Sequence, residues 1–215
     1  MRSLWLSSLL WSCSVLSAPR VAADEALRKV PLLLHVAEHA GVPVADAAFL
    51  RQQVEFANLI YRAVGLELVV VKQQRLASRH ARLVQRRDRD ALQTSLQPGV
   101  VNWFVVATLM DVDEPGRERR GVHWRVRSDP RKHFVVVSAA SSPFVLAHEL
   151  GHFFGNQEHS EVPGNLMSYQ QTDAVPVLDQ VQKSRILTTL HALIERNELA
   201  LVTPTATETT APKRD

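Results

Sequence analysis

The stretch HELGHFFG at residues 148–155 carries two histidines four positions apart, with a glutamate beside the first of them. Residues four apart lie on one face of an α-helix, so a helical conformation directs His148 and His152 towards one point. Two imidazoles at this spacing are a common half of a zinc site, and Glu149, one step round the helix, reaches a water molecule beside the metal. The pentapeptide therefore predicts a hydrolytic metal site, with His148 and His152 as ligands and Glu149 as the base.

The residues after the pentapeptide fit a third ligand and a tight turn. Gly155 stands three residues after His152, where a chain that returns to the metal has to leave the helix and turn sharply, and glycine permits such a turn. His159 follows within reach of the same site. The segment PGNLMSY at residues 163–169 combines turn-forming residues with Met167, as expected of a loop that passes beneath a metal site.

Residues 148–169 resemble the metzincin superfamily of zinc endopeptidases, whose motif is H-E-x-x-H-x-x-G-x-x-H followed by a Met-turn. HELGHFFG fits this motif without change, and Met167 then corresponds to the Met-turn methionine. The third histidine of the motif falls on Glu158, and this chain has a histidine one residue later, at His159. The third ligand is therefore either His159, after a one-residue insertion, or Glu158. We favour His159, because matrixin-like members carry the third histidine eight residues before the methionine and imidazole is a common zinc ligand.

The resemblance also implies a mechanism and a further candidate residue. In this superfamily zinc activates a water molecule and polarises the scissile carbonyl group, while the glutamate, here Glu149, acts as general base and then as general acid. Met167-Ser168-Tyr169 is similar to the M-x-Y turn of astacins and serralysins, whose tyrosine helps to stabilise the transition state. Tyr169 either has that catalytic role or is an ordinary packed tyrosine, since matrixins work without it.

Hydrophobic patterning predicts an alternation of strands and helices along the chain. The third helix is expected to begin at Ser142-Pro143, with the Ser142 hydroxyl as its cap. The resemblance implies an α+β (α/β-like) fold with a mixed five-stranded twisted sheet, an antiparallel edge strand, an active-site helix, a Met-turn and a C-terminal helix. The expected strands are 31–38, 66–71, 100–110, 121–127 and 133–140, and the expected helices are 45–64, 143–155, 178–199 and one within the arginine-rich segment 72–89, where Arg75, Arg79, Arg82 and Arg86 would share a solvated face.

The ends of the 215-residue chain differ in composition from the middle. Residues 1–23 look like a secretory signal peptide, with a positive start, a short apolar run and small residues before Asp24. The apolar run is shorter than the roughly 20 residues that span a bilayer, which favours export over a membrane anchor. We therefore expect a zinc metallopeptidase domain at 24–201, a disordered Thr- and Pro-rich tail at 202–215, and a secreted or periplasmic location.

Composition argues against several other classes of function. Hydrophobic residues make up 46% of the chain and charged residues 22%, as in an ordinary folded domain. Removal of residues 1–23 takes away Arg2, Arg20 and no acidic residue, so the formal net charge falls from +3 to +1 and the case for a nucleic-acid partner disappears. The only cysteine, Cys13, lies in the same segment, which leaves no thiol to act as a ligand or nucleophile.

These observations together predict an exported, zinc-dependent endopeptidase. We expect a protein or peptide substrate to bind in extended form along the edge strand at 121–127, through the unpaired backbone groups of that strand. We also expect a monomer, with no nucleic-acid partner and no membrane span after signal removal. The alternative is a zinc-binding, catalytically degenerate binding protein on the same scaffold. The displaced third ligand favours this alternative, and Glu149, which a purely structural site does not need, argues against it.

Overall fold

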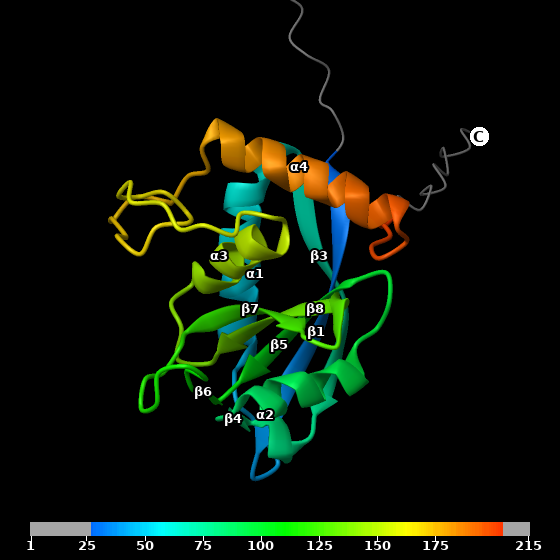
Figure 1. Ribbon diagram of the computed structural model, residues 1–215, viewed down its shortest axis with the longest axis vertical. Helices are drawn as coiled ribbons and strands as arrows, with labels where there is room; N and C mark the ends of the chain where they lie inside the picture. Colours follow the sequence, from blue (N-terminus) through cyan, green and yellow to red (C-terminus); the bar gives the residue numbers. More distant parts are fainter. Residues whose placement is uncertain (1–26, 204–215) are drawn as a thin grey trace, which may run out of the picture.

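The computed structural model describes residues 27–203, so the expected signal peptide at 1–23 and most of the expected tail at 202–215 lie outside the described residues. A twisted sheet forms the centre, and helices cover it (Figure 1). None of the helices within residues 27–203 is long and apolar enough to cross a membrane. The principal elements are β1 (Arg28–His39), α1 (Ala47–Tyr61), β3 (Leu66–Leu76), α2 (Arg86–Ala91), β5 (Val101–Val106), β7 (Gly121–Val126), β8 (Asp129–Ser138), α3 (Val145–Phe153) and α4 (Gln180–Glu195).

Five long strands make up the sheet, in the order β3, β1, β5, β8, β7. The first four run parallel to their neighbours, whereas β7 is antiparallel to β8 and forms one edge. A sixth member, β2 (Val42–Pro43), has only two residues and pairs with the end of β1. The predicted fold class, α+β with a mixed sheet and an antiparallel edge strand, is therefore confirmed.

Both faces of the sheet are covered, which explains why its central strands are apolar without interruption. Side chains of a strand alternate between the two faces. In β5, Val101, Trp103 and Val105 belong to the core shared with α1, α3 and α4. Phe104 and Val106 belong to the second core on the opposite face, which includes residues of two more short strands, β4 (Arg82–Leu83) and β6 (Thr108–Leu109).

The expected helix in the arginine-rich segment 72–89 is wrong. β3 continues to Leu76, because its parallel pairing with β1 extends as far as Ala37. A short 3-10 helix (Ser78–His80) and β4 follow, and α2 has only six residues. Leu76, Ala81 and Leu83 fill the second core, so tertiary packing sets the local conformation here. The four arginines therefore lie on four different elements and share no helical face: Arg75 on β3, Arg79 on the 3-10 helix, Arg82 on β4 and Arg86 on α2.

The cap of α3 also differs from the expectation. The helix begins at Val145, and Phe144, which precedes it, makes no side-chain cap. The Gln53 side chain of α1 takes this role, because its Oε1 accepts a 3.0 Å hydrogen bond from the Leu146 N–H. Its Nε2 donates to the Ser142 carbonyl at 2.8 Å. The prediction of a Ser142 hydroxyl cap was wrong, and a buried amide from a neighbouring helix fixes the start of α3.

His35 lies in the centre of the sheet and is fully buried. Its Nε2–H donates to Asn102 Oδ1 at 3.0 Å, and Gln74 donates to its Nδ1 at 2.8 Å, so the neutral ring satisfies both neighbours. Its ring stacks on Phe104. Burial lowers the pKa of His35 to about 4; the bond to Asn102 opposes this shift and the nearby charge of Lys72 adds to it.

Candidate active site

Three imidazoles meet beside the edge strand β7. His148 and His152 come from consecutive turns of α3, and His159 comes from the loop after it. Their ligand atoms all lie within 4.8 Å of one another, and the Nε2 atoms of His152 and His159 are 3.2 Å apart. Among residues 27–203 this is the one such group of three or more possible ligands. Glu158, the alternative third ligand, is exposed and lies outside the group.

The backbone orients two of the three rings. His148 Nδ1 donates to the Leu166 carbonyl at 2.8 Å, and His152 Nδ1 donates to the Asn156 carbonyl at 2.7 Å. A carbonyl oxygen only accepts, so each ring carries its proton on Nδ1 and keeps a lone pair on Nε2. Burial lowers the pKa of His148, and burial with the neighbouring His148 lowers that of His152 to about 4. Both rings are therefore neutral at neutral pH, the form that binds metal.

The three histidines fit a zinc ion. Two nitrogens that each lie about 2.0–2.1 Å from a tetrahedral ion are about 3.3 Å apart, close to the 3.2 Å between His152 and His159. Three imidazoles also match the ligand type that catalytic zinc prefers, with a fourth position left for water or substrate. His148, His152 and His159 are thus the residues that would hold the metal.

Gly155 allows the chain to return from α3 towards the site. Its φ of 97° lies in the region that side chains disfavour, and a Cβ there would lie 2.5 Å from Thr189 Oγ1 of α4. Both the turn and the close helix therefore require glycine. Further along, the Ser160 N–H donates to the Met167 carbonyl at 2.9 Å. This bond ties the loop that carries His159 to the turn that carries Met167.

Met167 packs directly beneath the site and is fully buried. Its sulfur lies so close to Gly151 that a Cβ at position 151 would overlap it. The turn itself is held by Asn165, whose amide exchanges two hydrogen bonds, of 3.0 and 2.9 Å, with the amide of Gln182 in α4. Because the adjacent Leu166 carbonyl orients His148, α4 and the Met167 turn together fix the position of a candidate ligand.

The Glu149 side chain lies between α3 and β7. Burial raises its pKa to about 8, while a hydrogen bond from the His123 backbone and the charges of Arg119 and Arg89 act in the opposite direction. A Cβ at Gly121 would lie 2.7 Å from Glu149 Oε1, so the first residue of β7 touches the carboxylate. The edge strand predicted to bind substrate therefore runs directly beside the candidate base.

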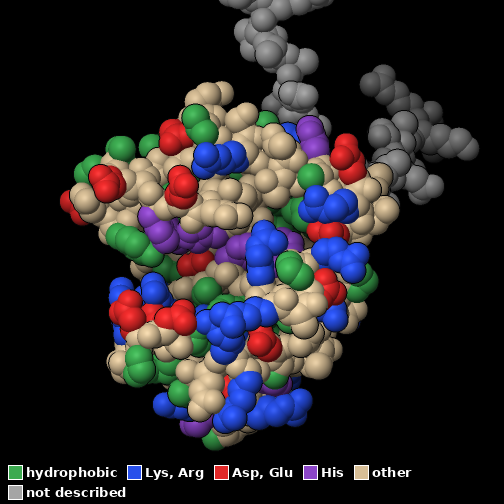
Figure 2. All heavy atoms as spheres, in the orientation of Figure 1, with side chains coloured by type: hydrophobic (Ala, Val, Ile, Leu, Met, Phe, Trp, Pro, Cys, Tyr) green, Lys and Arg blue, Asp and Glu red, His purple; other side chains and the backbone are tan. Residues whose placement is uncertain are grey.

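Tyr169 is 69% exposed and is not packed in the core. Its ring stacks on His159 at a centroid distance of 4.2 Å and lies 6.1 Å from the ring of His148. Two cavities, of about 270 and 550 Å³, adjoin the histidines, and both are lined by Arg119, Gly121, Glu149 and Tyr169. Figure 2 shows histidine side chains along a hollow that crosses this face of the molecule.

Sequence reasoning missed several residues that shape this site. Gln53 was one, although a polar residue between Leu50 and Ala57 on the apolar face of α1 was a detectable signal. Gly121 and Arg119 were others, and no local pattern distinguished them.

His123 lines the larger cavity, and its Nε2 lies 2.9 Å from Nδ1 of His133, which stacks on Phe153 behind the site.

Comparisons with known proteins give structural neighbours only. No protein-family model matches the chain, and a search of curated proteins gives no match by sequence. Mature mirolysin of Tannerella forsythia, in complex with a cleaved peptide, is similar with a TM-score of 0.56 and 11% identity over 81% of this chain and 99% of that one. Mirolysin in complex with compound 9 gives 0.57 and 10% over the same shares.

A second neighbour is metalloproteinase-II of Bacteroides fragilis, with a TM-score of 0.51 and 17% identity. The match covers 77% of this chain and 55% of that chain, so this protein spans about half the length of that neighbour. The fold is therefore metzincin-like: a mixed sheet with an antiparallel edge strand, a helix that bears two histidines, a methionine turn beneath it and a C-terminal helix.

Proposed function

We propose that this protein is a zinc-dependent endopeptidase. The observation that carries the proposal is the convergence of three imidazoles, His148, His152 and His159, beside the buried carboxylate of Glu149 in an open cleft. A purely structural zinc site is closed by four protein ligands and needs no acid beside it. Here the described residues offer three ligands that border the cavities, which would leave room for water or substrate beside the metal.

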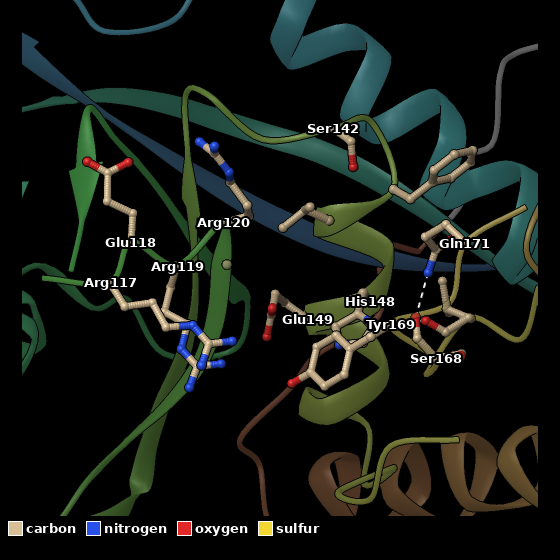
Figure 3. A pocket seen from close by; sticks show the side chains of 14 residues that line it. Arg117, Glu118, Arg119, Arg120, Ser142, His148, Glu149, Ser168, Tyr169 and Gln171 are labelled. Carbon is tan, nitrogen blue, oxygen red and sulfur yellow. Dashed lines mark hydrogen bonds between the residues drawn. The ribbon is translucent and has the colours of Figure 1, made fainter. Parts of the chain in front are cut away.

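The roles of the residues follow from their positions. A zinc ion bound by the three histidines supplies Lewis acidity, which makes water more acidic and polarises a carbonyl group. The Glu149 carboxylate accepts the proton of the attacking water and passes it to the leaving amine. Its burial raises its pKa above the usual range of a carboxyl group, which makes the carboxylate a stronger proton acceptor. Tyr169, whose hydroxyl group points into the cleft in Figure 3, donates a hydrogen bond to the carbonyl oxygen as negative charge develops.

A peptide substrate fits the edge of the sheet. Within residues 27–203 β7 pairs only with β8, so its other edge offers unpaired backbone groups to an extended peptide. That edge begins at Gly121, in contact with Glu149. The mirolysin structure holds a cleaved peptide, which supports a peptide as the substrate of this similar fold.

The proposal extends to the subfamily, the export and the oligomeric state of the protein. The chain is a matrixin-like metzincin with an M-x-Y turn of the astacin and serralysin kind, as Met167 and Tyr169 suggest. It is exported after cleavage before Asp24 and acts as a monomer. N-terminal sequencing of the protein recovered outside the cytoplasm tests the cleavage site, and a mature chain that begins elsewhere would contradict it.

The experiment that tests the function compares the wild-type protein with Glu149→Gln. Both are expected to bind one zinc ion per chain, measured by elemental analysis, because glutamine leaves the three histidines in place. Cleavage of a quenched fluorescent peptide library should fall by about 10²–10⁴-fold in the variant. If the wild-type protein binds zinc but cleaves no peptide, the alternative of a catalytically degenerate binding protein replaces the proposal.

A further inference from the structure

The smaller cavity beside Glu149 has an unusual wall. One side is formed by residues 117–121, the segment that leads into β7, and the facing side by Ser168, Tyr169 and Gln171. The first segment reads Arg-Glu-Arg-Arg-Gly, so three arginine residues line a space of about 270 Å³. In the view of Figure 3 the side chains of Arg117 and Arg119 extend to the side on which Glu149 and Tyr169 lie, whereas Glu118 points away.

A buried carboxylate fixes Arg119 in this position. Arg119 Nε donates to Asp111 Oδ2 at 2.5 Å, and only 3% of the Asp111 side chain is exposed. Asp111 Oδ1 accepts hydrogen bonds from the backbone N–H groups of Asp113 and Glu114, at 2.9 and 3.1 Å. These bonds lower the pKa of Asp111 to about 2, so it is ionised at any working pH. The arginine fork is thus held in place before a ligand arrives, which reduces the entropy lost on binding.

Positive charge on this wall is only partly neutralised. Asp111 bonds to Nε of Arg119. Arg117 pairs with Glu114 at the surface, and Arg120 has no ion-pair partner among the described residues. The facing wall adds the uncharged residues Ser168 and Gln171. Glu149 also lines the cavity, and the proposed function assigns this residue to catalysis.

We propose that this cavity binds a carboxylate group of the substrate next to the bond that is cleaved. A guanidinium fork matches the two oxygens of a carboxylate in shape and charge. The carboxylate comes either from an Asp or Glu side chain or from the C-terminus of the substrate. This inference rests on the proposed function, because it names the chemical class of substrate that the same cleft selects.

Binding is tested on the full chain with Glu149→Gln, so that no peptide is consumed. Fluorescent peptides are made in pairs that differ only by Glu or Gln at one position, and their dissociation constants are measured by anisotropy. A charge-assisted, partly buried hydrogen bond corresponds to a difference of at least about tenfold, in favour of Glu at one position. A second series compares the free acid with the amide at the C-terminus. A preference confined to this second series assigns the cavity to the terminal carboxylate.

Variants separate this cavity from general surface charge. Arg119→Gln in the same background should abolish the preference, and Arg119→Lys should restore part of it, because lysine keeps the charge but not the fork. Arg62→Gln is the matched control, since Arg62 is also ion-paired with a carboxylate but lies in the 3-10 helix after α1 and lines neither cavity. It should leave the preference unchanged. Equal binding of both members of every pair, or equal loss with Arg119→Gln and Arg62→Gln, would overturn the inference.

Failure of this inference is distinct from failure of the proposed function. If the wild-type protein cleaves neutral and acidic peptides with equal kcat/KM, it is a peptidase and the cavity does not select a carboxylate. If the Glu149→Gln protein binds acidic peptides selectively but the wild-type protein cleaves none, the carboxylate site stands and the peptidase assignment fails.

Discussion

Replacement of Gly121 by alanine should lower kcat/KM about 100-fold and leave the zinc content unchanged. A Cβ at position 121 would lie 2.7 Å from Cγ and Oε1 of Glu149 and 2.5 Å from Cγ1 of Val145. Non-bonded carbons pack at about 3.5–4.0 Å, so the neighbours have to retreat by about 1 Å. Gly121 does not have a positive φ, so its backbone suits alanine and the cost is one of contact alone.

The size of the effect follows from what has to move. A displacement of about 1 Å at a reacting group costs about 10²-fold in rate. Insertion of an extra methyl group into a site that is already well packed lowers the free energy of unfolding by about 1–3 kcal/mol. The candidate zinc ligands are other residues, and the rings of two of them are held by the carbonyl groups of Leu166 and Asn156. Activity should therefore fall much further than stability or metal binding.

A double variant separates the two contacts. Val145→Ala removes the closest clash and leaves that with Glu149, so Gly121→Ala/Val145→Ala should regain stability without regaining activity. The assays are peptide cleavage, denaturant unfolding and elemental analysis on the same preparations. The reasoning is refuted if Gly121→Ala retains full kcat/KM, or if Val145→Ala restores activity together with stability.

Three further outcomes are expected. In chelator competition, His159→Ala should weaken zinc binding more than about tenfold and Glu158→Ala should not; the reverse order would make Glu158 the ligand. In urea unfolding, Met167→Ala should lower the free energy of unfolding by about 2–5 kcal/mol and Met167→Leu by less than about 1.5 kcal/mol, and equal losses would contradict the packing against Gly151. The pKa of His35 is about 4 in the folded protein, so as the pH falls below about 6.5 the unfolded chain is protonated at this residue before the folded one. The free energy of unfolding of the wild-type protein should therefore fall by up to about 3 kcal/mol between pH 6.5 and pH 4. His35→Gln should show a smaller pH dependence over that range, and an unchanged slope would refute the assignment.

Much of the fold was readable from local patterns. Alternating or continuous apolar runs predicted the strands β1, β5, β7 and β8. A strand with one buried face alternates between apolar and polar residues, and a strand with two buried faces is apolar throughout. The arginine-rich segment was misread for the opposite reason. Its few apolar residues, such as Leu76 and Leu83, take their conformation from strands that are distant in sequence, and no local period records that pairing.

The candidate metal ligands were also local. His148 and His152 lie on one helical face wherever that helix forms, and Gly155, His159 and Met167 follow within 20 residues. Their chemistry could therefore be inferred from residue types and spacing, since helix geometry converts spacing into direction. His159 lies beside the other two whereas Glu158 is exposed, and the bond between Ser160 and Met167 ties this loop to the Met167 turn.

The surroundings of these residues come from segments far apart in the chain, and only folding reveals them. Gln53 caps a helix that begins more than 90 residues later, Gln182 holds the Met167 turn, and Gly121 admits the edge strand against Glu149. Asp111 fixes Arg119 in the cleft in the same way. Short-range geometry thus accounts for how the candidate ligands and the candidate base could be recognised in the sequence. Long-range packing determines how the base is buried, how the ligands are oriented and which charges a substrate meets, because contacts between distant segments leave no periodic signal in the sequence.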